Sequence, residues 1–194
     1  ALTTDQVVAL TTAQISKLLD TQVKEMSTAQ IAAIETADIA KMTNDQVAAI
    51  TTAGIVALST GQVQALTASQ LANLTTAQVA AIETADIAAL TTAQISKLTM
   101  DQMPALTTAQ VAAIETADLV LLTNSQIESI STAGIAALST DQVKVITTSQ
   151  IKALTAAQIT ALTTDVSVIA TDQLRQLNDE QVAAITTAGI AALT

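Results

Sequence analysis

An eight-residue repeat runs through almost the whole chain and limits what it can fold into more than any other feature. Large aliphatic residues recur at spacings of five and three, as at Leu2, Val7 and Leu10. Twenty-four consecutive units follow one plan, close to L-T-T-A-Q-V-A-A. The phase holds up to Leu162, loses one residue within 163–168, and then resumes. A fixed period of this kind is typical of stacked repeats, so residues 1–194 are expected to form one continuous array.

Neither a long α-helix nor a β-strand fits this spacing. Eight residues at about 100° each advance by about 800°, so an apolar stripe would drift about 80° around a long helix with every unit. In a strand, odd spacings would send successive large side chains to opposite faces, and Ala and Gln are poor strand formers. The sequence therefore predicts an all-α solenoid of very short helices, each of about five or six residues.

Each unit offers two adjacent positions that can cap its helix. The second position after the Leu-type residue holds Thr, Asn or Asp in nearly every unit, as in Thr4 and Asp20. Such side chains accept hydrogen bonds from the free N–H groups of a first helical turn. The residue before it is usually also Thr or Ser, so that Thr3 with Gln6 would form a capping box. The sequence supports both registers, and the choice between them stays open.

A single unit cannot fold alone. Its two large aliphatic side chains contribute roughly 4 kcal/mol when buried, against about 12 kcal/mol of conformational entropy for eight ordered residues. The stability of each repeat must therefore come from the neighbouring repeats of the same chain, which are its first expected partners. Both ends of the sequence carry ordinary units in place of polar caps, which favours a segment of a longer array.

The residue before each Val or Ile position indicates how many units make one coil. This residue is nearly always Gln. The departures are Asp38, Gly54, Asp86, Asp118, Gly134, Asp165 and Gly189. Six of these seven fall on alternate units, which favours two different environments and a coil of two octads.

Composition argues against most catalytic and nucleic-acid-binding functions. The chain has no Cys, His, Phe, Tyr or Trp, so common metal ligands, the usual neutral-pH base and base-stacking rings are all missing. A formal charge of −10 repels a phosphate backbone. No apolar run approaches the roughly 20 residues of a membrane helix. We therefore expect no enzyme activity, no cofactor, no nucleic-acid partner and no membrane insertion.

The motif ETAD is the clearest grouping of ionisable side chains. It pairs Glu35 with Asp38, Glu83 with Asp86, and Glu115 with Asp118. Acids stabilise a helix N-terminus by about 0.3–1 kcal/mol, and this structural interpretation is preferred. An acid pair of glycosidase type would need aromatic sugar platforms, and calcium, the remaining alternative, lacks both the Gly-rich nonapeptide and the EF-hand loop. No catalytic, cofactor-binding or metal-ligating residue is assigned.

The string LTTAQVAAIETADIAALTTAQI, from Leu74 to Ile95, resembles the octapeptide tracts of very large bacterial secreted or surface proteins named for haem utilisation, adhesion or haemagglutination. The resemblance extends over the whole chain and implies a stalk or adhesin at an extracellular or bacterial cell-surface location. It transfers no haem ligand, because the chain has neither His nor Cys. The opening LTTDQVVAL is also similar to the start of the DNA-reading repeats of transcription-activator-like effectors, but those repeats are much longer and carry a basic stripe.

These observations favour a non-catalytic structural segment, a rod-like spacer or stalk in a bacterial secreted or surface protein. The alternative is a solenoid module that binds a surface protein or a glycan through an extended face. Regular spacing of Thr and Ala also suggests ice binding as a third hypothesis, although many of those Thr residues are needed for capping.

Overall fold

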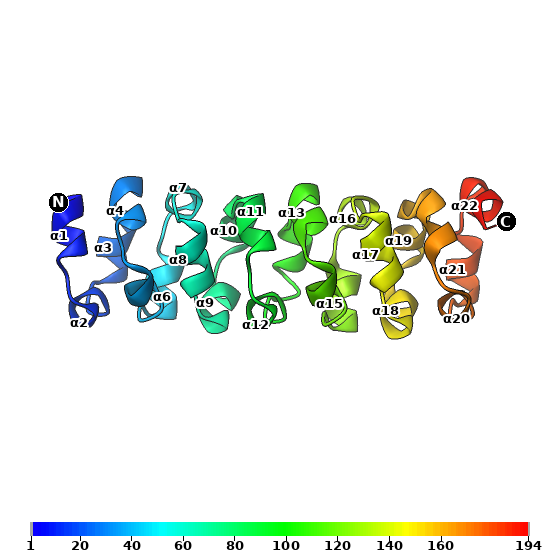
Figure 1. Cartoon of the computed structure of the whole chain (residues 1–194), viewed down its shortest axis with the longest axis horizontal. Coiled ribbons are helices and arrows are strands. Elements are labelled where there is room, and N and C mark those ends of the chain that lie inside the picture. The colour runs from blue at the N-terminus through cyan, green and yellow to red at the C-terminus, as the bar shows by residue number, and fades with distance from the viewer. Residues whose placement is uncertain (1, 194) are drawn as a thin grey trace. The chain divides into compact units, whose positions relative to one another are not determined.

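The computed structural model describes residues 2–193, apart from the side chain of Thr164. This part of the chain forms 22 α-helices of four to six residues and two 3₁₀ helices, and it contains no strand (Figure 1). The predicted all-α array of very short helices with an eight-residue repeat is therefore confirmed.

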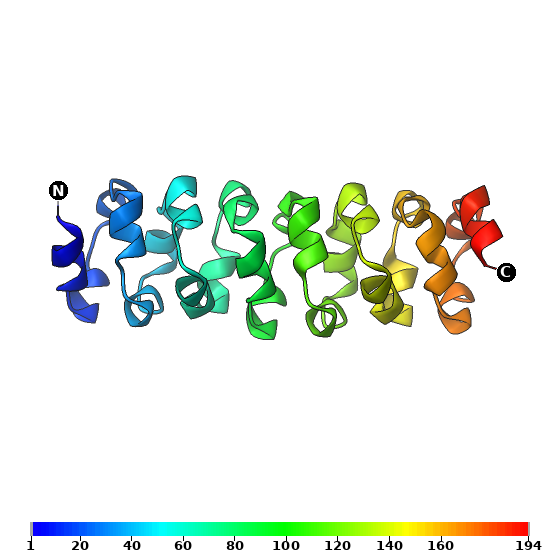
Figure 2. The same cartoon turned by 45° about the horizontal axis from the view of Figure 1, so that its top comes forward.

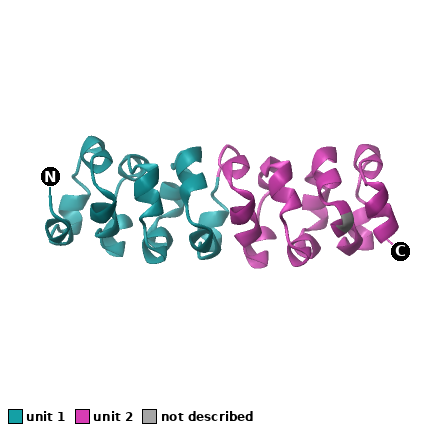
Figure 3. Cartoon of the chain, turned by 90° about the horizontal axis from the view of Figure 1, so that it is seen from above, with its two compact units in different colours: residues 1–98 teal, residues 99–194 magenta. Residues whose placement is uncertain are grey.

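The chain divides into two compact units, residues 1–98 and residues 99–194 (Figure 3). The first unit holds α1 (Thr4–Val8), α2 (Thr12–Ile15), α3 (Asp20–Lys24), α4 (Thr28–Ala32), α5 (Thr36–Ile39), α6 (Asn44–Ala48), α7 (Thr52–Val56), α8 (Thr60–Ala65), α9 (Ala68–Ala72), α10 (Thr76–Ala81), α11 (Thr84–Ala88) and α12 (Thr92–Ile95). The second unit holds η1 (Met103–Ala105), α13 (Thr108–Ala113), α14 (Thr116–Leu119), α15 (Asn124–Ser129), α16 (Thr132–Ala136), α17 (Thr140–Val145), α18 (Thr148–Ala153), α19 (Ala156–Ala161), η2 (Thr163–Val168), α20 (Thr171–Leu174), α21 (Asp179–Ala183) and α22 (Thr187–Ala192).

Most helices begin with a capping box on the first of the two candidate positions. In α1, the Thr3 hydroxyl accepts from the Gln6 N–H at 3.2 Å, and the Thr3 N–H donates to Gln6 Oε1 at 2.9 Å. Thr4 is already the first helical residue. Of the two registers that the sequence left open, the structure therefore adopts the box from Thr3 to Gln6, which satisfies two groups that a helix start would otherwise leave free.

The chain turns between helices without help from glycine. After α10, Ile82 has φ −61° and ψ 133°, and Glu83 has φ −64° and ψ 148°. Any L-residue adopts this extended conformation without strain. No glycine in residues 2–193 has a positive φ. Ordinary residues can therefore occupy the turn, which explains how an eight-residue repeat manages with only four glycines.

Each helix packs against the helix three octads away. In the first unit, α4 contacts α7, α5 contacts α8 and α6 contacts α9, and the same spacing joins α13 to α16 in the second unit. Figure 2 shows these short helices stacked side by side within each unit. One coil therefore contains three octads, or 24 residues, and the prediction of two octads per coil is wrong.

The alternation behind that prediction does not follow the coil. Asp38 and Asp86 lie two full coils apart at equivalent positions, whereas Gly54 lies on another side of the coil. A residue that replaces Gln thus occurs on different sides of the array, so its spacing carries no information about where a coil closes.

Two aliphatic positions in each octad line the core, as the spacing predicts. The first is the fourth helical residue, represented by Leu71 and Val79, both with 0% exposed surface. The second is the residue before the N-cap, represented by Leu66 and Leu74, which are also buried. Because every octad supplies both, the core continues from coil to coil within each unit.

Two octads in the second unit replace the α-helix with a 3₁₀ helix. In the first, Thr99 and Gln102 still form both bonds of the capping box, but Pro104, which has no N–H, lies in η1. In the second, η2 contains the one-residue deletion, and buried Val166 fills the inward position one residue early. Thr163 begins η2 with φ 46°, the one positive φ outside glycine in residues 2–193. The deletion is therefore absorbed locally.

Candidate functional site

A buried glutamine at the third helical position is the polar feature that recurs most often in the fold. Gln70 in α9 is 1% exposed. Its Oε1 accepts from the Thr67 N–H at 2.6 Å, and its Nε2 donates to the Ile39 carbonyl at 2.8 Å and the Met42 carbonyl at 2.7 Å. Those carbonyls belong to the preceding coil. One side chain therefore completes its own helix cap and joins two coils.

The same pair of cross-coil bonds recurs along both units. Carbonyls 31 and 28 residues earlier accept from Gln46, Gln62, Gln94, Gln142, Gln150 and Gln158. Each such bond contributes about 1 kcal/mol net, and losing it leaves a buried carbonyl without a partner. Sequence reasoning missed this role, although the near-constant Gln at one position of the octad was its signal.

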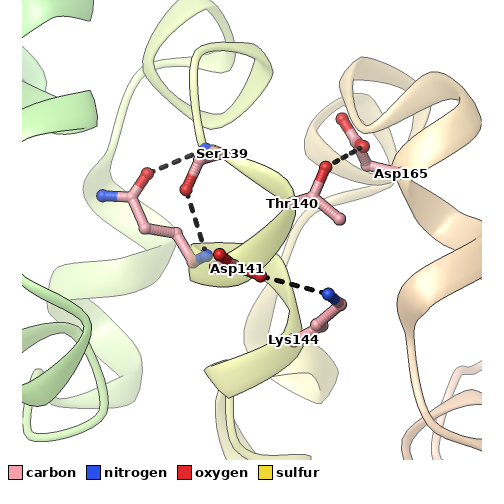
Figure 4. A network of polar contacts seen from close by, with 6 residues as sticks. Ser139, Thr140, Asp141, Lys144 and Asp165 are labelled. Carbon is pink, nitrogen blue, oxygen red and sulfur yellow. Dashed lines mark hydrogen bonds and ion pairs between the residues drawn. The ribbon is translucent and has the colours of Figure 1, made fainter.

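Exposed contacts also join successive coils but are weaker. Figure 4 shows the start of α17, where Ser139 forms the capping box and the Thr140 hydroxyl donates to Asp165 Oδ1 at 3.3 Å. In the same view Lys144 and Asp141 form an ion pair at 3.1 Å, with half or more of each side chain exposed. Exposed pairs of this kind contribute about 0–1 kcal/mol. The buried glutamines are therefore the main polar link between coils.

The acids of the ETAD motif separate into an exposed Glu and a buried Asp. Glu35, Glu83 and Glu115 are N-cap residues that make no side-chain cap bond. Asp38, Asp86 and Asp118 lie in the first turn, as predicted, but are only 3%, 2% and 5% exposed. Each Asp takes the position that Gln occupies in other octads. The acids are therefore helix-start residues whose Asp faces the interior.

Three octads place Gly at the glutamine position, and a neighbouring Ile explains why. A Cβ added to Gly54 would lie 2.7 Å from Ile50 Cγ2, and one added to Gly134 would lie 2.8 Å from Ile130 Cγ2. All six regular octads that lack Gln have Ile before the N-cap: Ile34, Ile50, Ile82, Ile114, Ile130 and Ile185. Most glutamine octads have Leu or Met there. This pairing within the octad was a second signal that sequence reasoning missed.

The remaining candidate groups are dispersed. All six lysines are exposed, in agreement with a solubilising role. Met42 and Met103 are buried in the aliphatic pattern, Met26 is half-buried and Met100 is 59% exposed. Among residues 2–193, no group of three or more acidic, His or Cys side chains is placed to hold a metal. No helix in this part of the chain has the length and apolar character needed to cross a membrane.

A pocket of about 250 Å³ opens in the first unit. Its lining residues are Leu2, Leu18, Gln22, Glu25, Met26 and Gln30. Glu25 is the one ionisable side chain among them, so this lining provides no pair of groups for acid–base catalysis. The pocket therefore offers an apolar surface and no arrangement of reactive groups.

Comparison with known families agrees with the repeat seen in the structure. The profile of the ALTTAQ repeat matches residues 21–52, 31–68, 39–76, 79–113 and 111–148. The matches that begin at residues 31, 39, 79 and 111 are separated by multiples of eight, which is the length of one octad. No curated protein matches the chain. Because the matched segments together cover well over half of the 194 residues, the chain belongs to the ALTTAQ repeat family.

Proposed function

We propose that this chain is a non-catalytic spacer, a repeat segment that holds other parts of a larger protein apart. The observation that carries the proposal is the uniformity of the contacts between coils. Each helix packs against the helices three octads away, and the glutamine bonds repeat at separations of 28 and 31 residues. No octad among the described residues combines reactive groups that the others lack.

Contacts of this range suit a spacer for a physical reason. When each repeat contacts only its neighbours, stability is nearly a sum of repeat and interface terms, so repeats can be added without redesigning the rest. Length then follows from copy number. Membership of a tandem repeat family supports the same role.

Small-angle scattering tests the spacer directly. A compact domain of this length has a radius of gyration of about 16 Å, and the spacer proposal expects a clearly larger value. In a tandem duplication of the chain, the radius of gyration should come close to doubling, whereas a compact body would grow only about 1.3-fold. Light scattering on the same samples controls for self-association. Compact values for both proteins would refute the proposal.

We also propose an extracellular or bacterial-surface location, which rests on the resemblance to octapeptide tracts of secreted proteins. Protease treatment of intact cells that express the full-length parent protein tests it, with cleavage of the repeat as the expected result. Protection from protease in intact cells, together with cleavage after lysis, would refute it. Ice binding is not part of the proposal, because capping occupies the first Thr of most pairs.

A further inference from the structure

Asp86 stands where a donor is expected. In the glutamine octads, the residue at this helical position donates to carbonyls 31 and 28 residues earlier. For Asp86 the corresponding carbonyls are those of Ile55 and Leu58 in the preceding coil, and α11 packs on α8 in the usual way. The Asp86 carboxylate makes no hydrogen bond or ion pair with a described residue, although the residue is 2% exposed. The Leu58 carbonyl also accepts none.

A carboxylate and a carbonyl cannot satisfy each other. Both are acceptors, so bringing them together out of water is unfavourable unless a donor or a cation lies between them. Asp is one methylene shorter than Gln, which leaves space between its carboxylate and the carbonyls that Gln would contact directly. Every side-chain N or O atom closed to solvent in the described residues has a partner, so the carboxylate oxygens of Asp86 keep a narrow contact with solvent.

A second carboxylate is available at the same helix start. Glu83, the N-cap of α11, is exposed and makes no cap bond or ion pair with its side chain. It replaces the Thr or Ser that caps the glutamine octads. The two carboxylates with the two carbonyls form a set of hard oxygen donors, which is the chemistry that calcium prefers, with water completing its six to eight ligands.

We propose that octads of the ETAD type bind calcium, held by Asp86 and by the Ile55 and Leu58 carbonyls, with Glu83 as a further ligand. Asp38 forms the equivalent site. It is 3% exposed and unbonded, it faces the Val7 and Leu10 carbonyls, and Glu35 is its N-cap. The donor set differs from the EF-hand and the Gly-rich nonapeptide, whose absence made calcium the minor alternative in the sequence. The inference is independent of the spacer role.

Equilibrium dialysis of the whole chain against ⁴⁵Ca²⁺ measures the binding. We expect saturable binding of at least two ions per chain. Bound calcium stabilises the folded state by mass action, so the unfolding midpoint in far-UV circular dichroism should rise by about 3 °C or more between EDTA and millimolar CaCl₂. Mg²⁺ should act more weakly, because it keeps its water ligands and demands octahedral geometry.

The variant pair Asp38→Asn and Asp86→Asn removes both charges with little change in shape. It should lower bound calcium by two ions per chain and remove the corresponding rise of the midpoint. A second pair, Asp38→Gln and Asp86→Gln, restores the residue of the glutamine octads and should lose calcium binding while folding without calcium. Asp45→Asn, on an exposed first-turn acid, is the matched control and should bind as the unmodified chain does.

Three results would overturn the proposal. One is the absence of saturable binding at millimolar calcium. Another is unchanged binding in a folded Asn or Gln variant. The third is a midpoint that ignores calcium but rises in acid, which would show that a proton lies between the carboxylate and the carbonyl.

Discussion

The octads at residues 67–74 and 83–90 share one backbone but have different polar side chains. Helices α9 and α11 are both five residues long and begin at the same phase of the repeat. The first has a full capping box and two cross-coil bonds from Gln70. The second has Glu83 and Asp86, whose side chains make none of these bonds. The helix therefore forms without the polar contacts, and the apolar pattern sets its position.

The polar contacts then decide how stable each part of the array is. A cap contributes about 1 kcal/mol, and each glutamine bond contributes a similar amount. Because energies in a repeat array are nearly additive over neighbours, octads that lack Gln should be local weak points. Without a ligand, their amides should exchange hydrogen faster than those of glutamine octads.

Gln70→Glu should cause the largest loss. The carboxylate can still accept from the Thr67 N–H but cannot donate, so the buried Ile39 and Met42 carbonyls lose their partner and face a charge. We expect the free energy of unfolding to fall by about 3 kcal/mol or more, measured by urea denaturation. Gln22→Glu is the control, because exposed Gln22 makes no cross-coil bond and the change should stay within about 0.5 kcal/mol. Equal losses would contradict the ladder.

Gly54→Ala should have the next largest effect. The new Cβ would lie 2.7 Å from Ile50 Cγ2 in a packed corner, and overpacking of this kind costs about 1–3 kcal/mol. Gly61→Ala is the matched control within the same unit. Its Cβ would meet only Thr36 Cγ2 at 3.7 Å, so the higher helix propensity of Ala should raise stability by about 0.5–1 kcal/mol. Thermal unfolding of both variants checks the opposite signs.

The apolar spacing was enough to predict the helices and the core. Spacings of five and three fit neither a long helix nor a strand, and the structure buries both aliphatic positions, as at Leu66 and Leu71. The coil could not be predicted in the same way. It depends on the direction that the chain takes at residues such as Ile82 and Glu83, whose extended φ and ψ are open to any residue type.

The polar half of the octad was harder to predict for a different reason. The partners of Gln70 are backbone carbonyls 28 and 31 residues earlier, and carbonyls have no signature in the sequence. Asp38 was correctly predicted to lie at a helix start. Its burial follows from the stacking of coils, because the third helical position faces the preceding coil, and that geometry is known only once the coil is known.

Thr75→Ala and Thr76→Ala test the choice of cap with adjacent residues. The Thr75 hydroxyl accepts from the Gln78 N–H at 3.2 Å, so its loss should cost about 1 kcal/mol. Thr76 is the first helical residue, and its exposed side chain makes no hydrogen bond with a described residue. Its replacement should change stability by no more than about 0.5 kcal/mol. The reverse order in urea denaturation would favour the other register.

Glu83→Ala should have the smallest effect, although Glu83 occupies the same N-cap position in α11 that Thr75 occupies in α10. No cap bond is lost, so in EDTA we expect the free energy of unfolding to change by less than about 0.5 kcal/mol. A loss near 1 kcal/mol in EDTA would mean that Glu83 caps its helix after all. If a loss appears only when calcium is added, the glutamate contributes through the ion, and the acid octads have exchanged an internal cap for an external ligand.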